Sequence, residues 1–232
     1  MKKKAVLFWS GGKDSALALH FSRQNKDIEV VALVCTLNDE YKRVSMHGIR
    51  EDVIERQASQ TGLPIIKMWI PNEPENSAYE NALILTYQKL KVTGVEVIIY
   101  GDIFLKDIRL YRDRILKDAG LEGYFPLWNR DTFELINEFL NLGFKTLICC
   151  INTARLDNSC LGKELNRIFL NTLPITVDPC GENGEFHTFC FSGPVFSEDV
   201  AFETGEKHYS ALQIKSKDDE TTETGFWYVD II

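Results

Sequence analysis

The sequence predicts an α/β fold in which a doubly wound, Rossmann-like parallel sheet is joined to a smaller C-terminal lobe. Short β-branched or aromatic runs alternate with longer helical patterns, which is typical of βαβ units. Most of these runs are almost continuously apolar, as expected of parallel strands buried on both faces. A glycine follows each of four predicted helices, where a left-handed cap residue is favoured: Gly62, Gly94, Gly120 and Gly143.

The elements follow one another without long gaps. Each strand candidate is a short run rich in β-branched or aromatic residues, and each helix candidate has apolar residues at helical spacing. Ser77 with Glu80, and Asp131 with Glu134, have the spacing of capping boxes and mark two helix starts. The predicted strands are residues 5–9, 29–35, 65–70, 95–101 and 145–151. The predicted helices are residues 15–24, 49–61, 78–93, 108–119 and 132–142.

The helical periodicity fades after about residue 150, where turn-rich and strand-like segments replace it. We therefore expect a first domain over residues 1–151 and a smaller second lobe over residues 152–232, with a cleft between them. Within this lobe, residues 186–191 and 225–232 are strand candidates. The polar segment 215–225 is expected to be mobile.

Composition excludes several classes of protein. A formal net charge of −8 disfavours a nucleic-acid partner, because a polyanion-binding surface is usually basic. Six cysteines without any C-x-x-C spacing suit buried reduced thiols, which indicates a cytoplasmic location. No apolar run approaches the length of a membrane span, and the N-terminal one is shorter than the core of a signal peptide. A homodimer is compatible with this interpretation.

The first predicted strand runs into the loop Ser-Gly-Gly-Lys-Asp-Ser, residues 10–15. In a doubly wound sheet this loop and the following helix N-terminus face an anion at the carboxyl edge. The glycines allow close backbone approach, the serines and the lysine donate hydrogen bonds, and the aspartate suits Mg²⁺ or a helix cap. A plain strand-to-helix turn is the alternative. The predicted ATP-binding residues are Ser10, Gly11, Gly12, Lys13, Asp14 and Ser15.

A second polar group lies in "GENGEFHTF", residues 181–189. It places Glu182, Glu185 and His187 close together. These side-chain types bind Mg²⁺, recognise an ammonium ion or remove a proton from ammonia. The alternative is a polar β-turn that leads into a strand.

Further candidates follow other strands at the same edge of the sheet. His47 comes after the second strand and is a candidate for contact with the nucleotide. Gly101 and Asp102 close the fourth strand, where the glycine permits close approach and the aspartate suits Mg²⁺, substrate or a helix cap. Arg109 and Arg112 are expected near the cleft as ligands of a phosphate or carboxylate, with a solvated helix face as the alternative.

The loop Ser-Gly-Gly-Lys-Asp-Ser after a first strand resembles the PP-loop of the ATP pyrophosphatases, the N-type superfamily of the adenine nucleotide alpha hydrolase-like fold. It differs from the Walker loop, because Asp14 instead of Ser or Thr follows Lys13. Within the superfamily, an ordered set of motifs resembles the diphthine-ammonia ligase family and its bacterial relatives over residues 4–197. These motifs are "SMHGIR" (45–50), "YGDI" (100–103), "RLYRDRILKDAGLEGYFPLW" (109–128), "LNLGFK" (140–145), "LDNSCLGKEL" (156–165) and "GENGEFHTF" (181–189).

The resemblance implies a ligase that uses ATP and Mg²⁺. A substrate carboxylate would attack the α-phosphate, pyrophosphate would leave, and ammonia would convert the acyl-adenylate into an amide. Implied metal ligands are Asp14 and Asp102, and implied catalytic residues are Lys13, Glu182, Glu185 and His187. Implied substrate-binding residues are Arg109, Arg112, Asp157, Asn183 and Gly184.

The identity of the acceptor is left open by two residues. The diphthine enzymes usually have Gly and Glu where this chain has Asn183 and His187. Diphthine on a translation factor is therefore one candidate acceptor. A corrinoid carboxylate, as in a bacterial subgroup linked to cobalamin salvage, is the other. A nucleotide sensor without chemistry and a tRNA-modifying PP-loop enzyme are further alternatives, and the net acidity disfavours the latter.

Overall fold

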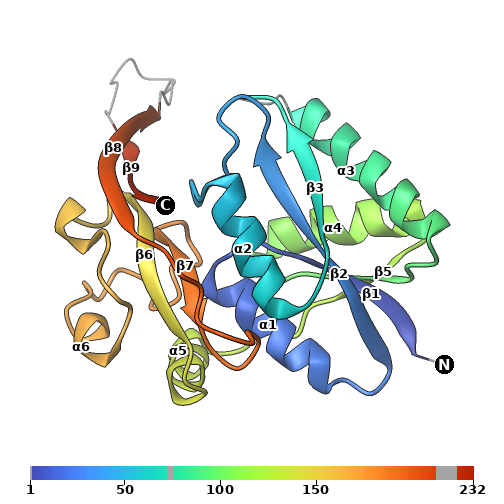
Figure 1. The fold of residues 1–232 in the computed structure, drawn as a ribbon, viewed down its shortest axis with the longest axis horizontal. Helices are drawn as coiled ribbons and strands as arrows, with labels where there is room; N and C mark the ends of the chain where they lie inside the picture. Colours follow the sequence, from blue (N-terminus) through green and yellow to red (C-terminus); the bar gives the residue numbers. More distant parts are fainter. Residues whose placement is uncertain (1, 73–75, 213–223) are drawn as a thin grey trace.

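A computed structural model describes residues 2–72, 76–212 and 224–232 of the chain, and Figure 1 shows two β-sheets with helix α1 between them. One sheet is five-stranded and parallel, with the strand order β3-β2-β1-β4-β5. This order confirms the predicted doubly wound α/β fold. Its strands are β1 (Lys3–Phe8), β2 (Ile28–Asn38), β3 (Ile65–Ile70), β4 (Val97–Ile99) and β5 (Glu122–Tyr124).

Helices cover both faces of the parallel sheet. Side chains alternate along each strand, so Ala5 and Leu7 of β1 join the core formed with α1 and α2, whereas Val6 joins the core formed with α3 and α4. Both faces of the sheet are therefore buried, which explains the apolar runs. The helices are α1 (Lys13–Gln24), α2 (Glu51–Thr61), α3 (Asn76–Val92), α4 (Lys106–Ala119) and α5 (Thr132–Asn141).

One predicted helix start is confirmed and the other is wrong by two residues. Asp131 is the N-cap of α5, and its side chain accepts a hydrogen bond from the backbone nitrogen of Glu134 at 2.9 Å. By contrast, α3 begins at Asn76, so Ser77 lies inside its first turn. The predicted glycine stops are confirmed, since Gly62 and Gly120 cap α2 and α4 in the left-handed conformation.

The second sheet is antiparallel and has the strand order β7-β6-β9-β8. Strand β6 (Lys145–Asn152) pairs with β7 (Phe186–Ser192) and β9 (Thr224–Ile231), so placing residues 145–151 in the parallel sheet was wrong. A central strand of either sheet is buried on both faces, and the apolar run cannot distinguish them. The fifth parallel strand is β5, whose three residues are too few to show a period. The remaining elements are β8 (Thr204–Leu212), the 3₁₀ turn η1 (Asn158–Cys160) and α6 (Arg167–Leu170).

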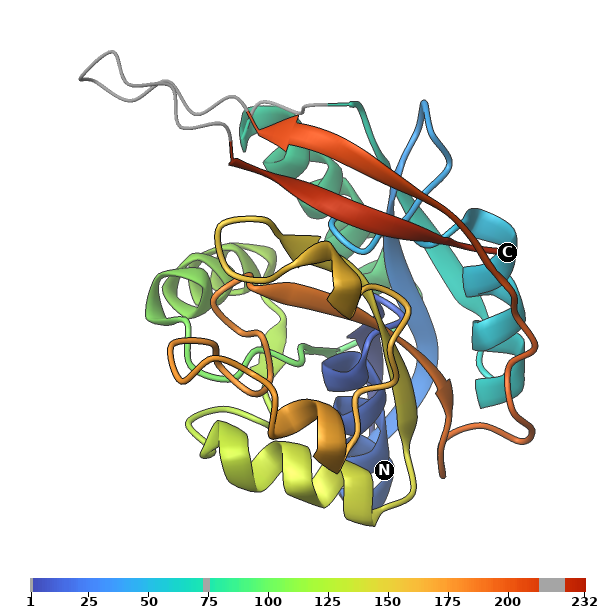
Figure 2. The same cartoon turned by 90° about the vertical axis from the view of Figure 1, so that its left-hand side faces the viewer.

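The two sheets lie on opposite sides of α1 and share one continuous core, which includes Leu7 of β1 and Phe189 of β7. In Figures 1 and 2 the C-terminal end of β9 lies beside α2. Asp230 of β9 forms an ion pair there with Arg50, the N-cap residue of α2. The domain division after residue 151 stays a prediction, with β6 assigned to the second sheet. The segment 215–225, expected to be mobile, lies almost entirely outside the described residues.

Candidate active site

A cavity of about 530 Å³ opens at the carboxyl edge of the parallel sheet, and its volume is within the range of small-ligand sites. Residues at the ends of β1, β2 and β4 line it, and so do residues that precede or belong to β7. The cavity therefore lies where the two sheets meet, as the sequence predicts. The predicted site residues that line it are Ser10, Asp14, Ser15, His47, Gly101, Asp102, Arg112, Glu182 and His187.

The predicted phosphate loop joins β1 to α1. The N-cap residue of α1 is Gly12, so no side chain of that residue caps the helix. Gly11 has a φ of +81°, and a Cβ on Gly12 would lie 2.6 Å from Cε1 of His47. Larger residues are excluded at both positions, because the first has a left-handed backbone and the second touches an imidazole ring. The positive dipole end of the helix at this loop suits an anion, with the first N–H group, that of Lys13, already bonded to Thr188.

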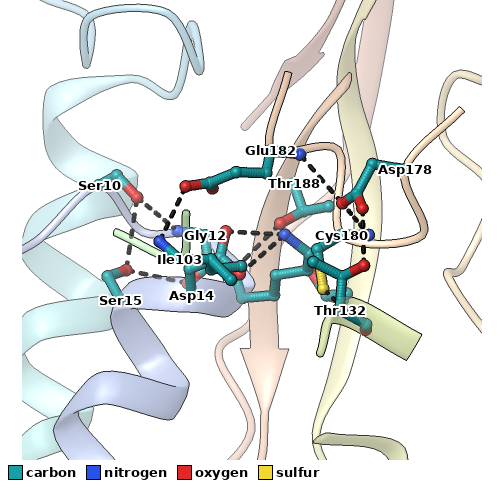
Figure 3. A network of polar contacts seen from close by, with 12 residues as sticks. Ser10, Gly12, Asp14, Ser15, Ile103, Thr132, Asp178, Cys180, Glu182 and Thr188 are labelled. Carbon is teal, nitrogen blue, oxygen red and sulfur yellow. Dashed lines mark hydrogen bonds and ion pairs between the residues drawn. The ribbon is translucent and has the colours of Figure 1, made fainter. Parts of the chain in front are cut away.

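Lys13 and Asp14 form an ion pair with each other at 2.7 Å. Only Asp14 lines the cavity, whereas Lys13 is 4% exposed and has its ammonium 5.8 Å from the centre of the Phe186 ring. The loop therefore exposes a carboxylate to the cavity, and the lysine ammonium lies behind it. Figure 3 shows Asp14 and the two loop serines in this network.

The second sheet and α2 hold the loop in place. Thr188 of β7 accepts a hydrogen bond from the backbone nitrogen of Lys13 at 3.0 Å, and the nitrogen of Cys190 donates to the Gly11 oxygen at 2.8 Å. Gln57 of α2 is 0% exposed and makes three hydrogen bonds. It accepts from Nε1 of Trp9 at 2.6 Å and donates to the carbonyl oxygens of Gly11 and Cys190 at 2.8 and 2.6 Å.

Sequence reasoning missed Gln57, Thr188 and Trp9. One signal was present for Gln57, which shares the buried face of α2 with Val53, Ile54, Ala58 and Thr61. A glutamine on an apolar helix face must have buried hydrogen-bond partners. Thr188 gave no comparable signal, because polar residues in strands are common.

His47 and His187 face each other in the cavity wall, with ring centres 4.8 Å apart. Nδ1 of His47 lies 2.9 Å from the Thr188 carbonyl oxygen, so it carries a proton and donates to that oxygen. Burial lowers the pKa of His47 to about 4, with the Thr188 contact opposing and Lys13 adding to the effect. Burial, then His47 and Lys13, lower the pKa of His187 far below 6.5. Both rings are therefore neutral at neutral pH.

Glu182 connects the turn before β7 to the segment after β4. Its Oε1 accepts hydrogen bonds from the backbone nitrogens of Ile103 at 2.8 Å and Phe104 at 3.3 Å (Figure 3). The turn is closed by Asp178, which accepts from the backbone nitrogen of Glu182 at 3.3 Å and from the Thr132 hydroxyl at 2.7 Å. Burial, and then the charge of Asp14, raise the pKa of Glu182 to about 7. This carboxyl therefore titrates near neutral pH.

Glu185 is 2% exposed, yet its carboxylate is only half satisfied. Oε1 accepts from the backbone nitrogen of Asp178 and from Nδ2 of Asn183, each at 3.1 Å. Oε2 is buried and has no hydrogen-bond partner among the described residues, and the same is true of Nε2 of His187. Buried polar atoms without partners are costly and are expected where a ligand completes the site. A plain β-turn does not account for them.

The wall after β4 is formed by Gly101, Asp102 and Arg112. A Cβ on Gly101 would lie 3.0 Å from the carbonyl carbon and oxygen of Asp14, which requires glycine here. Asp102 accepts from Nε of Arg112 at 2.6 Å and from its Nη2 at 3.2 Å. Each oxygen of Asp102 thus accepts one hydrogen bond from Arg112, and the role of Asp102 as a Mg²⁺ ligand stays a prediction.

Four predicted substrate residues lie outside the cavity. Arg109 packs its guanidinium 3.6 Å from the centre of the Phe125 ring and pairs with Asp113 at 2.9 Å. Asn183 and Gly184 are in the turn before Glu185. Asp157 caps the 3₁₀ turn η1 and lines a separate hollow beside Trp227.

For Mg²⁺, the described residues contain no group of three or more His, Cys, Asp or Glu side chains arranged to hold a metal. Magnesium in nucleotide sites is usually held by one or two carboxylates together with phosphate oxygens and water. Asp14, at the cavity wall beside the loop, fits the requirement for one such carboxylate.

Comparison with protein families matches residues 2–123 to the diphthamide synthase N-terminal domain and residues 131–218 to the diphthamide synthase C-terminal domain. Among curated proteins, diphthine–ammonia ligase of Bos taurus is 27% identical over 129 residues, which cover 53% of this chain and 47% of that protein. The enzyme of the same name from Saccharomyces cerevisiae is 24% identical over 255 residues, covering 91% of this chain and 37% of that protein. That of Schizosaccharomyces pombe is 23% identical over 151 residues, covering 63% and 22%.

The matched regions thus span less than half the length of these relatives. Among solved structures, a chain described as a predicted subunit of tRNA methyltransferase from Methanocaldococcus jannaschii has a TM-score of 0.38 and 13% identity, covering 65% of this chain and 79% of that chain. The assignment of the fold therefore rests on the strand order itself. Within the described part of the chain, no helix has the length and hydropathy needed to cross a membrane.

Proposed function

Because the chain belongs to the diphthamide synthase family, we propose that it is an ATP-dependent ligase that joins ammonia to a substrate carboxylate. The support comes from the cavity, which is lined by Asp14 and Ser15 at the N-terminus of α1 and by Glu182 and His187. Glu185 lies between these last two in sequence and is buried, outside the residues that line the cavity. One observation carries the proposal: buried Oε2 of Glu185 and Nε2 of His187 have no hydrogen-bond partner in the described chain. Two buried polar atoms left without a partner in this segment suit a nitrogen nucleophile that donates hydrogen bonds and must lose one proton.

In the first step, the substrate carboxylate attacks the α-phosphate of ATP, the bond between the α- and β-phosphates breaks, and pyrophosphate leaves. We propose that Ser10, Ser15 and the backbone N–H groups of Asp14 and Ser15 bind the phosphates, since the N–H of Lys13 already donates to Thr188. We propose that His47 contacts the nucleotide beside this loop, with its imidazole ring neutral. Bound Mg²⁺ would neutralise phosphate charge, with Asp14 as its protein ligand.

Lys13 has a less direct part in the described conformation. Its ammonium pairs with Asp14 and lies outside the cavity wall. We propose that Lys13 offsets the charge of Asp14 and reaches pyrophosphate only when that ion pair opens. A lysine that contacts phosphate directly is the alternative, and Lys13→Met would distinguish the two by its effect on nucleotide affinity.

In the second step, ammonia attacks the acyl carbon, AMP leaves and one proton is released. Glu182, with a pKa of about 7, is proposed to take that proton. We propose that Glu185 orients the ammonia through its unpartnered Oε2 and that His187 does so through Nε2 of its neutral ring.

The acceptor is proposed from the turn that the diphthine enzymes share. Diphthine on a translation factor is the first candidate. A corrinoid carboxylate is the second, and it is favoured by one observation, that His187 lines the cavity at the position of the usual glutamate. The cytoplasmic location and the homodimer stay predictions.

The test is a product assay with purified protein, α-labelled ATP, Mg²⁺ and ammonium, with and without each acceptor. AMP and pyrophosphate that form only with an acceptor, together with an amide, are the expected result. Glu185→Gln should abolish amide formation while nucleotide affinity is retained. ADP as product, or nucleotide binding without any turnover, would contradict the ligase and favour a sensor. Tight tRNA binding at physiological salt would favour a tRNA-modifying enzyme.

A further inference from the structure

The guanidinium group of Arg112, in α4, is held by Asp102 along one edge and by Tyr100 on one face. Asp102 accepts from Nε and Nη2 along one edge, and the guanidinium carbon lies 3.8 Å from the centre of the Tyr100 ring. A carboxylate fork and an aromatic face together define both the direction and the plane of a guanidinium. Arg112 is therefore preorganised before any ligand binds.

The support beneath Arg112 is itself rigid. Tyr100 is buried, stacks on Phe8 with ring centres 4.7 Å apart and on Phe125 at 5.6 Å, and its hydroxyl is hydrogen-bonded to that of Tyr87. Side chains fixed by packing and by a second layer of hydrogen bonds hold a binding group more precisely than loops do.

The other edge of Arg112 is free. Its Nη1 makes no hydrogen bond with any residue of 2–72, 76–212 or 224–232, and the side chain is 18% exposed where it lines the cavity. Nη1 and the second proton of Nη2 form a second fork, which matches a carboxylate or a phosphate.

Arg112 lines the same cavity as the phosphate loop, and apolar side chains line this cavity too. Asp102, which holds Arg112, directly follows Gly101, and Gly101 packs on the first turn of α1 at Asp14. Around the arginine, Tyr79, Ile108 and Tyr111 line the same cavity. An anion on Arg112 would thus lie near the phosphate loop, with its carbon skeleton against aromatic and aliphatic side chains.

We propose that the free edge of Arg112 binds the acceptor's carboxylate and that Asp102 is a positioning residue for Arg112, not a metal ligand. The acceptor class is a carboxylic acid with an apolar or planar carbon skeleton next to the carboxylate. This proposal rests on the proposed ligase function, in which the acceptor is the substrate whose carboxylate is activated. A nucleotide phosphate has the same anionic chemistry, so the test must separate the two sources.

The test measures affinity for two probes, 3-phenylpropionate and the neutral 3-phenylpropanamide. The full chain is first saturated with α,β-methylene-ATP and Mg²⁺, and binding is followed by ligand-observed NMR. We expect the wild type to prefer the carboxylate about tenfold, as a charge-assisted fork should. In Arg112→Gln the preference should fall to about one while the amide binds unchanged. Asp102→Asn should reduce the preference part of the way, because the guanidinium loses its fixed orientation.

Arg114→Gln is the matched control. Arg114 is on the same helix and also contacts a carboxylate through two hydrogen bonds, to Glu80, but it is exposed and lies outside the cavity wall. This variant should keep the wild-type preference. Retained binding of the amide and of the nucleotide analogue shows that each variant is folded.

Two results would overturn the inference: an unchanged carboxylate preference in Arg112→Gln, or no preference in the wild type. Loss of α,β-methylene-ATP affinity in Arg112→Gln with the probe preference kept would assign the arginine to a phosphate instead. The ligase proposal fails separately, because its failure is the absence of AMP and pyrophosphate while the probe preference persists.

Discussion

Gln57 is the residue whose replacement should most clearly reveal how the phosphate loop is supported. Gln57→Met keeps the length of the side chain and removes all three hydrogen bonds. Nε1 of Trp9 then loses its one hydrogen-bond partner among the described residues, in a position where Trp9 is 1% exposed. The carbonyl oxygens of Gly11 and Cys190 lose the amide donor.

The expected cost follows from these losses. An orphaned buried donor costs about 1–3 kcal/mol, and each of the two lost amide bonds about 0.5–1.5 kcal/mol, so unfolding should become easier by about 2–6 kcal/mol. Gly11 keeps the hydrogen bond from the nitrogen of Cys190, so the loop should remain formed but less firmly held. Affinity for α,β-methylene-ATP should therefore fall several-fold in the variant.

Urea unfolding followed by circular dichroism measures the free energy, and calorimetry measures the nucleotide affinity. Gln60→Met is the control, because Gln60 is on the same helix and its side chain accepts a hydrogen bond from the exposed hydroxyl of Ser197, away from the loop. That variant should stay within about 0.5 kcal/mol of the wild type. If the Gln57 and Gln60 variants unfold alike, or if Gln57→Met binds nucleotide normally, the argument for support of the loop through α2 is refuted.

Three further predictions use other contacts of the site. The pKa of Glu182 is raised from 4.5 to about 7, so the protonated carboxyl stabilises the fold fully below about pH 4.5, and this stabilisation is lost as pH rises through about 7. Glu182→Gln should therefore reduce the fall in unfolding free energy between these pH values. An unchanged pH dependence would contradict the raised pKa. Gly12→Ala places a Cβ 2.6 Å from Cε1 of His47 and should weaken nucleotide binding at least about tenfold. Adding His47→Ala removes the imidazole and should recover part of the lost affinity. If the double variant recovers none, the imidazole is not the obstacle. Arg109→Met should lower the unfolding free energy by about 1 kcal/mol through loss of its contact with the Phe125 ring, and a change in nucleotide affinity instead would return Arg109 to the site.

Much of the parallel sheet could be predicted, because its helices and longer strands carry clear periods and glycine stops. Strand β5 could not, since three residues give no period, and β6 could not be assigned to a sheet from its apolar run. Local sequence indicates that a segment is a buried strand, but not which strand will be its neighbour.

The same limit applies to the site. Its chemistry-bearing residues could be recognised because they cluster in short motifs at strand ends. Their partners could not, because Lys13 and Thr188 are 175 positions apart and the Asp102–Arg112 pair joins a loop to a helix. The partner decides the role: Arg112 and Arg109 are alike in sequence, yet one lines the cavity and the other packs on Phe125.

These long-range contacts also join the two sheets at the cavity. The phosphate loop is hydrogen-bonded to β7 through Thr188 and Cys190, and the turn before β7 is hydrogen-bonded to the segment after β4 through Glu182. A hinge between the two sheets would break all of these bonds and divide a continuous core. The second sheet is thus a fixed part of the proposed nucleotide site, because it supplies hydrogen bonds that hold the loop in shape.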